Sequence, residues 1–208
     1  VGTDFSADAE HALRVAIELA ERDGARLTVV HALPAPSRGV SLESLGLTRN
    51  DVQDRLASLV EALIEGNPRT EDAQELGTLN IVVRAGEAET VLIDASQQVR
   101  ADVIVVGRYG SDVVEHFFLG SVSNRLVRLS PRPVLVTHPK AATPIAMKNV
   151  VAAVDLGDMS DLIADTACAF VGEGGGLHLL NTFESVGNYE FSSVTPNLPQ
   201  GSFERELV

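Results

Sequence analysis

The sequence has no tryptophan, a single cysteine and few aromatic residues, which make up 4% of its 208 residues. With Cys168 alone, the chain can form neither an internal disulfide bond nor a cysteine-based metal site. Because Cys168 lies in an apolar, helix-like stretch, we expect an inert and buried thiol. Aliphatic side chains must therefore build the hydrophobic core of a chain whose hydrophobic residues make up 45% of the total.

Long apolar runs and an excess of positive charge are also absent. No run of about 18 apolar residues predicts a transmembrane helix, and no signal peptide is recognisable. We therefore expect a cytoplasmic protein with no membrane partner. The formal net charge is −13, which disfavours a nucleic-acid-binding function because proteins that bind the phosphate backbone need a basic surface.

The most informative stretch begins with the apolar, β-branched run Asp102–Val106, which is typical of a strand buried on both faces of a parallel sheet. Gly107 and Gly110 follow, and then Gly120 and Ser121, in the pattern G-x-x-G-x9-G-S. Helical periodicity resumes at Ser121, which we expect to be the N-cap. The sequence thus predicts a buried strand, a glycine-punctuated loop and a helix in succession.

This layout suits a phosphate. Glycine lets the backbone approach an anion closely, and the N-terminus of a helix attracts negative charge with unpaired N–H groups and its dipole. The hydroxyls of Ser121 and Ser123 can add hydrogen bonds, and Arg108 either contacts a terminal phosphate or is solvated. The alternative is that Gly107 and Gly110 only form a tight turn. Neither a Walker A sequence nor a G-x-G-x-x-G dinucleotide motif is present.

The loop, within ADVIVVGRYG and LGSVSNRLVRLSPRPVLVTHP, and the opening VGTDFSADAEHALRVAIELA together resemble the universal stress protein family, in its ATP-binding branch. The resemblance covers roughly residues 1–140. It implies an α/β fold with an open parallel five-stranded sheet in the order 3-2-1-4-5 and helices on both faces. It also implies ATP, AMP or ADP as the ligand, with Mg²⁺ or Mn²⁺ carried by the nucleotide.

The resemblance also implies which residues meet the nucleotide. The aspartate that matches Asp4 lies at the nucleoside, backbone groups at the position of Ala32 meet the adenine, and the glycine loop holds the phosphates. Independently, ligands of open α/β sheets bind where the strand order reverses, which here lies between the first and fourth strands. The candidate nucleotide-binding residues are Asp4, Ala32, Gly107, Arg108, Gly110, Gly120, Ser121 and Ser123.

The remaining elements follow from capping signals and periodicity. Ser6 and the pair Thr48 and Asp51 are expected to begin helices, and Gly24 and Gly66 to end them. We interpret His31, within a strand covered on both faces, as a packed core residue. The other expected elements are strands at Leu27–Leu33, Leu79–Val83 and Val134–Thr137 and a helix at Glu87–Val99.

After a linker at Pro139–Pro144 the pattern restarts, which predicts a partial second copy of the domain. We expect a strand that ends at Asp155, a helix at about Met159–Val171, a break at Gly172–Gly176 and a strand at Leu177–Thr182. Asp155 would then correspond to Asp4, and His178 to His31. The expected domains are residues 1–140 and 145–208, with residues 183–208 as a loop.

Three functions remain open. The first is an ATP-binding regulatory module of the stress response, and the second is a slow ATP hydrolase that uses Asp112, Glu115 and His116. The third is an interaction module without nucleotide. No standard catalytic or metal-binding arrangement is recognisable, so we assign no catalytic or metal-ligating residue.

The expected assembly follows from the edges of the sheet. Val1–Asp4 has the character of a strand end whose earlier residues are absent. Val134–Thr137 would be an apolar edge strand, and such an edge favours pairing with another strand. We therefore expect a homodimer through this strand, or a pseudo-dimer within one chain if a complete second copy exists.

Overall fold

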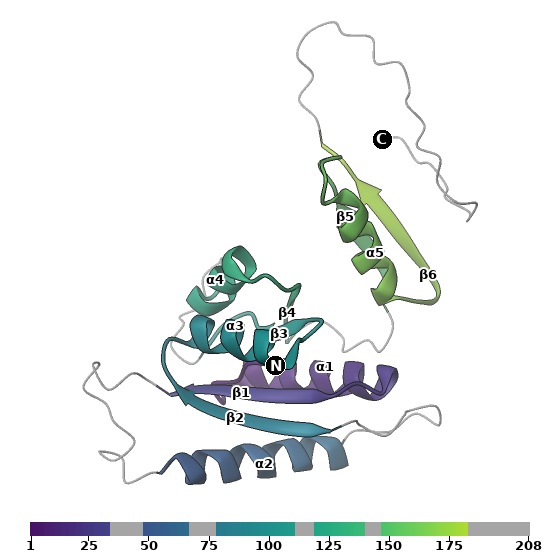
Figure 1. Ribbon diagram of the computed structural model, residues 1–208. Coiled ribbons are helices and arrows are strands. Elements are labelled where there is room, and N and C mark those ends of the chain that lie inside the picture. Colours follow the sequence, from purple (N-terminus) through teal and green to yellow (C-terminus); the bar gives the residue numbers. More distant parts are fainter. Residues whose placement is uncertain (34–47, 67–77, 111–118, 140–146, 183–208) are drawn as a thin grey trace, which may run out of the picture. The chain divides into compact units, whose positions relative to one another are not determined.

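A computed structural model describes residues 1–33, 48–66, 78–110, 119–139 and 147–182. The chain divides into two compact units, Val1–Met147 and Lys148–Val208. Figure 1 shows the elements in chain order: the first unit carries β1–β4 and α1–α4, and β5, α5 and β6 follow. None of the helices in the described ranges is both long and apolar enough to cross a membrane.

The strands of the first unit pair in parallel. β1 (Leu27–Leu33) pairs with β2 (Leu79–Ala85) along its whole length, and β3 (Ile104–Gly107) pairs with β4 (Val134–Thr137). The expected bounds of β1 and β4 are confirmed, and β2 continues beyond its expected end at Val83. Parallel pairing places the carboxyl ends of β1 and β2 together, and likewise those of β3 and β4.

The short segment Val1–Thr3 connects the two strand pairs. The N–H of Gly2 donates to the carbonyl of Val105 at 2.9 Å, and the N–H of Thr3 donates to the carbonyl of Val30 at 3.0 Å. The segment is paired with β1 by an isolated parallel bridge between Gly2 and Val30. The described strands form three two-stranded sheets, and the five-stranded order stays a prediction.

The helices begin and end largely where the local signals predict. The Ser6 hydroxyl accepts a hydrogen bond from the N–H of Ala9 at 3.2 Å, and Gly24 ends the first helix with a φ of 58°, which favours glycine. Thr48 and Asp51 form a reciprocal capping box. The helices of the first unit are α1 (Ala7–Asp23), α2 (Arg49–Glu65), α3 (Ala88–Val99) and α4 (Ser121–Leu129).

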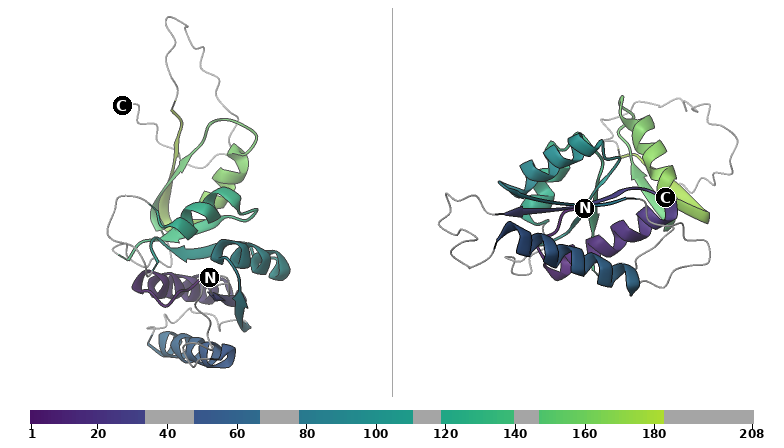
Figure 2. Two further views of the ribbon diagram at one scale, coloured as in Figure 1. Left: turned by 90° about the vertical axis from the view of Figure 1, so that its left-hand side faces the viewer. Right: turned by 60° about the horizontal axis from the view of Figure 1, so that its bottom comes forward.

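Two hydrophobic clusters show that helices cover both sides of these strands. Val29 packs in a cluster with side chains of α1 and α2 that include Leu13 and Leu56. The next residue, Val30, packs in the other cluster, with side chains of α3 and α4 that include Leu126. Successive residues of a strand point to opposite faces, so α1 and α2 cover one face and α3 and α4 the other (Figure 2).

The second unit has a strand–helix–strand order: β5 (Met147–Ala153), α5 (Ser160–Phe170) and β6 (Val171–Leu180). β5 and β6 pair with each other. The N–H of Val154 donates to the carbonyl of Leu180 at 2.8 Å, which places the carboxyl ends of the two strands side by side, as in a parallel pair. Of the described residues in this unit, Ala152 alone is a buried apolar residue.

Two expectations for the second unit are wrong. Gly172–Gly176 was expected to break the chain between helix and strand, but these glycines belong to β6, which begins directly after α5. Glycine adopts extended and left-handed conformations alike, and Gly174 does the latter within β6, with a φ of 69°. Cys168 was expected to be buried but is exposed, and α5 has no buried residue at all.

Candidate functional site

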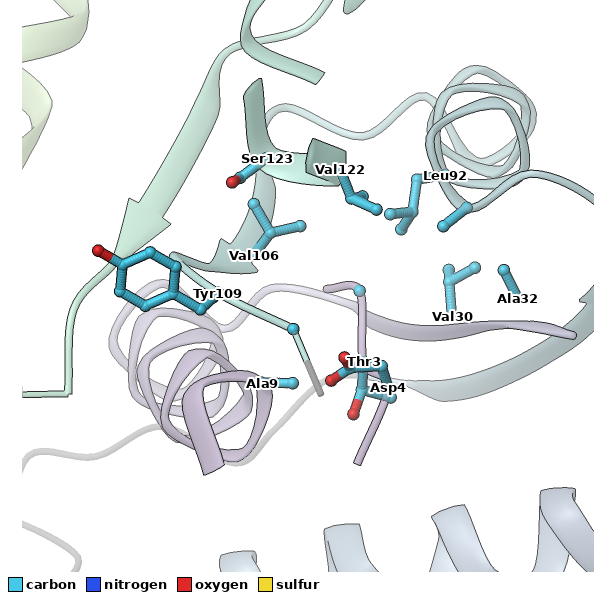
Figure 3. A pocket seen from close by; sticks show the side chains of 14 residues that line it. Thr3, Asp4, Ala9, Val30, Ala32, Leu92, Val106, Tyr109, Val122 and Ser123 are labelled. Carbon is cyan, nitrogen blue, oxygen red and sulfur yellow. The ribbon is translucent and has the colours of Figure 1, made fainter. Parts of the chain in front are cut away.

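A pocket in the first unit lies where Val1–Asp4, the carboxyl ends of β1 and β3, and the starts of three helices meet (Figure 3). It contains about 560 Å³ of empty space, part of which is open solvent. Its lining comes from elements that are far apart in the sequence. The lining residues are Gly2, Thr3, Asp4, Ala9, Val30, Ala32, Ala88, Leu92, Val106, Gly107, Tyr109, Gly110, Val122 and Ser123.

Asp4 and Gly110 meet at this pocket. The Asp4 carboxylate accepts a hydrogen bond from the N–H of Ser6 at 3.0 Å, which shapes the turn into α1. Its other oxygen lies so close to Gly110 that a Cβ at that position would be 2.8 Å from it. The absence of a side chain at Gly110 therefore allows the loop after β3 to pass beside the carboxylate. The structure thus brings together two residues that the sequence placed at one crevice.

Gly107 has a packing role that the motif did not reveal. A Cβ at this position would lie 2.7 Å from backbone atoms of Asp8, in the first turn of α1. The Asp8 carboxylate also accepts a hydrogen bond from the N–H of Tyr109 at 3.1 Å. The loop after β3 is therefore attached to the start of α1. Gly107 lines the pocket, but the close approach of α1 by itself explains why a glycine is there.

Gly120 and Ser123 close the other end of the loop. The N–H of Gly120 donates to the carbonyl of Arg108 at 2.8 Å, and the Ser123 hydroxyl lies 3.1 Å from the same carbonyl and 3.0 Å from that of Gly120. The buried Ser123 hydroxyl thus donates to the loop backbone, and its proposed contact with a phosphate stays a prediction. A side chain at Gly120 would lie 2.9 Å from the Arg108 carbonyl and would disturb the loop with or without a ligand.

The expected N-cap at Ser121 is wrong by one residue. α4 begins at Ser121, and Gly120 is its N-cap, without a side-chain hydrogen bond to the first turn. Ser121 is exposed and does not line the pocket, whereas Val122 and Ser123 do. The N-cap of α4 therefore gives the first N–H groups of the helix no side-chain hydrogen bond.

Arg108 and Tyr109 form a contact of their own beside the pocket. The guanidinium of Arg108 lies 4.9 Å from the centre of the Tyr109 ring, and Arg108 is not among the lining residues. Tyr109 lines the pocket, although the sequence analysis did not select it. The one feature of the sequence that could have indicated Tyr109 is its position between Gly107 and Gly110, because a residue within a ligand-binding loop must lie near the ligand.

The apolar walls of the pocket were also missed. Leu92 of α3 and Val122 of α4 lie on one side of the pocket, across from Asp4 (Figure 3). Ala32, near the end of β1, also lines the pocket. Leu92 and Val122 have the helical periodicity of ordinary core residues, and nothing in that pattern distinguishes a core side chain from one at a ligand.

Two further groups of titratable residues were considered from the sequence. His31 is a packed histidine, as expected: its Nδ1 lies 2.8 Å from the Thr3 carbonyl, and its ring contacts the ring of Phe5. Asp112, Glu115 and His116 lie outside the described residues. Where the structure describes the chain, no group of three histidine, cysteine, aspartate or glutamate side chains could hold a metal ion.

Comparisons with known proteins point to one family. The model of the universal stress protein family matches residues 1–138. A universal stress protein of Staphylococcus haemolyticus is 30% identical over 156 residues, which cover 69% of this chain and 91% of that protein. One of Staphylococcus saprophyticus is 32% identical over 141 residues, which cover 66% of this chain and 81% of that protein.

A solved structure shares the fold. The universal stress protein of Lactobacillus plantarum aligns with a TM-score of 0.54 and 22% sequence identity, over 65% of this chain and 93% of that chain. The shared α/β fold therefore extends over most of the relative, and the aligned share of this chain is about the length of the first unit.

Proposed function

The chain belongs to the universal stress protein family, and from this premise we propose that its first unit binds an adenine nucleotide and acts as a nucleotide-dependent regulatory module. The ligand is ATP, or AMP or ADP, with Mg²⁺ or Mn²⁺ carried by the nucleotide. The observation that carries the proposal is the pocket itself, which joins Asp4 and Ala32 to the glycine loop and the start of α4.

The start of α4 supports an anion at one end of the pocket. Among the helices that the structure describes, α4 alone has neither an acidic residue in its first turn nor a side-chain cap. Its N–H groups and the positive end of its dipole are therefore available to a phosphate. We assign the phosphates to Gly110 of the glycine loop and to Gly120 and Ser121 at the start of the helix, and the terminal phosphate to Arg108.

The other end of the pocket suits a nucleoside. The Asp4 carboxylate can accept hydrogen bonds from ribose hydroxyls, and the backbone of Ala32 can pair with the polar edge of the base. Val30, Leu92 and Val122 supply an apolar surface for its ring. A few convergent polar groups on an apolar wall are the usual composition of such sites.

We also propose that Val1–Thr3 is the central strand of a five-stranded sheet in the order 3-2-1-4-5. The hydrogen bonds from this segment to both Val30 and Val105 support that order, because they join the β1–β2 pair to the β3–β4 pair. The order places the carboxyl ends of the segment and of β3 side by side at the pocket, where an open α/β sheet binds its ligand.

The second unit is proposed to be a partial repeat of the first, and its turns support this. In Asp4–Ser6 the carboxylate of the first residue accepts a hydrogen bond from the N–H of the third at 3.0 Å, and the middle residue has a φ of 63°. In Asp155–Gly157 the same bond is 2.9 Å long and the middle φ is 62°. Positive φ is uncommon for residues other than glycine, so its occurrence in both turns is a specific likeness.

Hydrogen bonds around the two turns extend the likeness. The N–H of Thr3 donates to the carbonyl of Val30 at 3.0 Å, and the N–H of Val154 donates to that of Leu180 at 2.8 Å. In the first unit, Nδ1 of His31 lies 2.8 Å from the carbonyl of Thr3, the residue before Asp4. In the second unit, Nδ2 of Asn181 donates at 2.8 Å to the carbonyl of Val154, the residue before Asp155. Asn181 therefore takes the place that the sequence analysis gave to His178.

The test compares Asp4→Asn with the matched variant Asp155→Asn. Asparagine keeps an oxygen for the N–H at the turn but loses the charge. Titration calorimetry with ATP and Mg²⁺ should show binding by the parent, a loss of about tenfold or more in Asp4→Asn, and no change in Asp155→Asn. No binding by the parent, or equal losses in both variants, would contradict the proposal. Phosphate release faster than about 1 s⁻¹ in the same samples would indicate an enzyme.

A further inference from the structure

An ion pair joins α3 and α4 beside the pocket. Oε1 of Glu89 lies 2.6 Å from Nη1 of Arg125. Glu89 directly follows Ala88, and Arg125 lies shortly after Ser123; both Ala88 and Ser123 line the pocket. The ion pair therefore connects the two helices that form the wall opposite Asp4, without itself lining the pocket.

This ion pair is partly removed from solvent. The Glu89 side chain is only 12% exposed, whereas that of Arg125 is 56% exposed. Charge-assisted hydrogen bonds of this length are stronger than neutral ones, and burial of one partner raises the cost of separating them. Leu126, next to Arg125, is fully buried in the cluster shared with α3. An apolar contact and an ion pair thus fix the same turn of α4 to α3.

We propose that Glu89 and Arg125 are positioning residues for the phosphate end of the pocket. α4 has only nine residues, so a displacement of Arg125 would also move the first-turn N–H groups of the helix. The ion pair holds these groups at the distance from α3 that a phosphate requires. This inference rests on the proposed nucleotide function and adds the contact that orients its anion-binding helix.

The first measurement uses Glu89→Gln and Arg125→Gln with two ligands, ATP with Mg²⁺ and adenosine. Both variants should weaken ATP binding by about tenfold and adenosine binding by less than about threefold, because the phosphate contacts come from the first turn of α4, whereas Val122 is the one side chain of this helix that we assign to the base. Equal losses for the two ligands would show a general structural role and overturn the inference, as would unchanged ATP binding.

The two variants also separate positioning from simple charge. Glu89→Gln removes a negative charge near the phosphate, and Arg125→Gln removes a positive one. If charge at a distance were the cause, the first variant would strengthen ATP binding and the second would weaken it. Positioning requires that both weaken it, so shifts in opposite directions overturn the inference.

Arg128→Gln is the matched control, because it removes the same charge from the same helix. Arg128 is exposed and its Nε bonds to Asn124 at 3.0 Å, within α4. ATP binding should change by less than about twofold in this variant, since an exposed charge contributes little. A loss as large as that in Arg125→Gln would overturn the inference.

A measurement on the protein without ligand tests the role of the ion pair independently of the proposed function. Hydrogen exchange of the Asn124 amide, which donates to the Gly120 carbonyl at 2.9 Å, should be faster in Glu89→Gln and Arg125→Gln than in the parent and Arg128→Gln, because the first turn of α4 loses its attachment. Unchanged exchange overturns the inference. If the parent binds neither ATP nor adenosine, the proposed function fails, and the exchange rates still decide whether the ion pair positions the helix.

Discussion

The turn at Asp4 and the turn at Asp155 have the same hydrogen bonds and backbone conformation but different surroundings. Next to the first turn, Val30 is 4% exposed because side chains of α3 and α4 cover it. Leu180, which takes the corresponding position in the second unit, is 51% exposed. The same local chemistry therefore occurs once beside a pocket and once on an open surface of the described residues.

This difference shows what a turn can and cannot contribute to a site. The carboxylate of Asp4 is oriented by a neighbour two residues away, and that of Asp155 is oriented in the same manner. Only Asp4 also has Gly110 beside it, from a loop more than a hundred residues further along the chain. A binding site needs such distant segments, so the second turn alone is not expected to bind a nucleotide.

The largest expected effect concerns the mass of the protein in solution, which tests how the two units contribute to assembly. Among the described strands, β4 pairs with β3 alone, so its other edge can pair between two chains. We predict a homodimer through β4. Light scattering should give a mass near twice 22.1 kDa, and a chain that ends after His138 should remain dimeric.

Two outcomes would contradict the predicted homodimer. A mass of one chain at every concentration would exclude it. A dimer that is lost on removal of the second unit would instead assign the contact to the exposed apolar side chains of that unit, which include Val151 and Leu180.

The next effect compares the stability of the two units through matched leucines. Leu13 of α1 is fully buried, and Leu162 of α5 is 54% exposed. Leu13→Ala should lower the free energy of unfolding by about 2–5 kcal/mol, because it leaves a cavity in a packed core. Leu162→Ala should lower it by about 0.5 kcal/mol or less. Urea denaturation measures both, and similar losses would show that Leu162 is covered in solution.

The smallest effect concerns the start of α2. Hydrogen bonds from the N–H and hydroxyl of Thr48 lower the pKa of Asp51. A carboxyl whose pKa is lower in the folded state stabilises the fold above its unfolded pKa, and this stabilisation is lost as the pH falls through the folded pKa. Between about pH 6 and pH 3, the parent should therefore lose more stability than Asp51→Asn. Equal losses in denaturation curves would contradict this role.

Much of the fold follows from local signals in the sequence. Ser6, Gly24 and the pair Thr48 and Asp51 act on residues within a few positions of themselves, so their caps are predictable. The start of α4 is harder to predict, because both Gly120 and Ser121 are acceptable N-cap residues. The hydrogen bond from the N–H of Gly120 to the Arg108 carbonyl favours Gly120. The glycines of β6 were wrongly expected to form a break, because glycine is compatible with both a turn and a strand and the local pattern does not decide between them.

The site was predicted in part. The convergence of Asp4 and the glycine loop follows from the rule for strand ends, and the structure places both at one pocket. Leu92 and Val122 could not be selected, because the sequence pattern of a wall residue is that of any core residue. The Glu89–Arg125 ion pair could not be predicted from the sequence either, since the two residues are on different helices and no sequence spacing marks them as neighbours.

The sequence by itself determined which segments become strands and helices, where most helices begin, and that glycines follow β3, because these depend on neighbours a few residues away. Only the tertiary structure decided what each glycine and serine does. Gly107 accommodates the first turn of α1, and Ser123 donates to the carbonyl of Arg108. Such contacts depend on how distant elements pack, and packing is a property of the whole fold that no local pattern encodes.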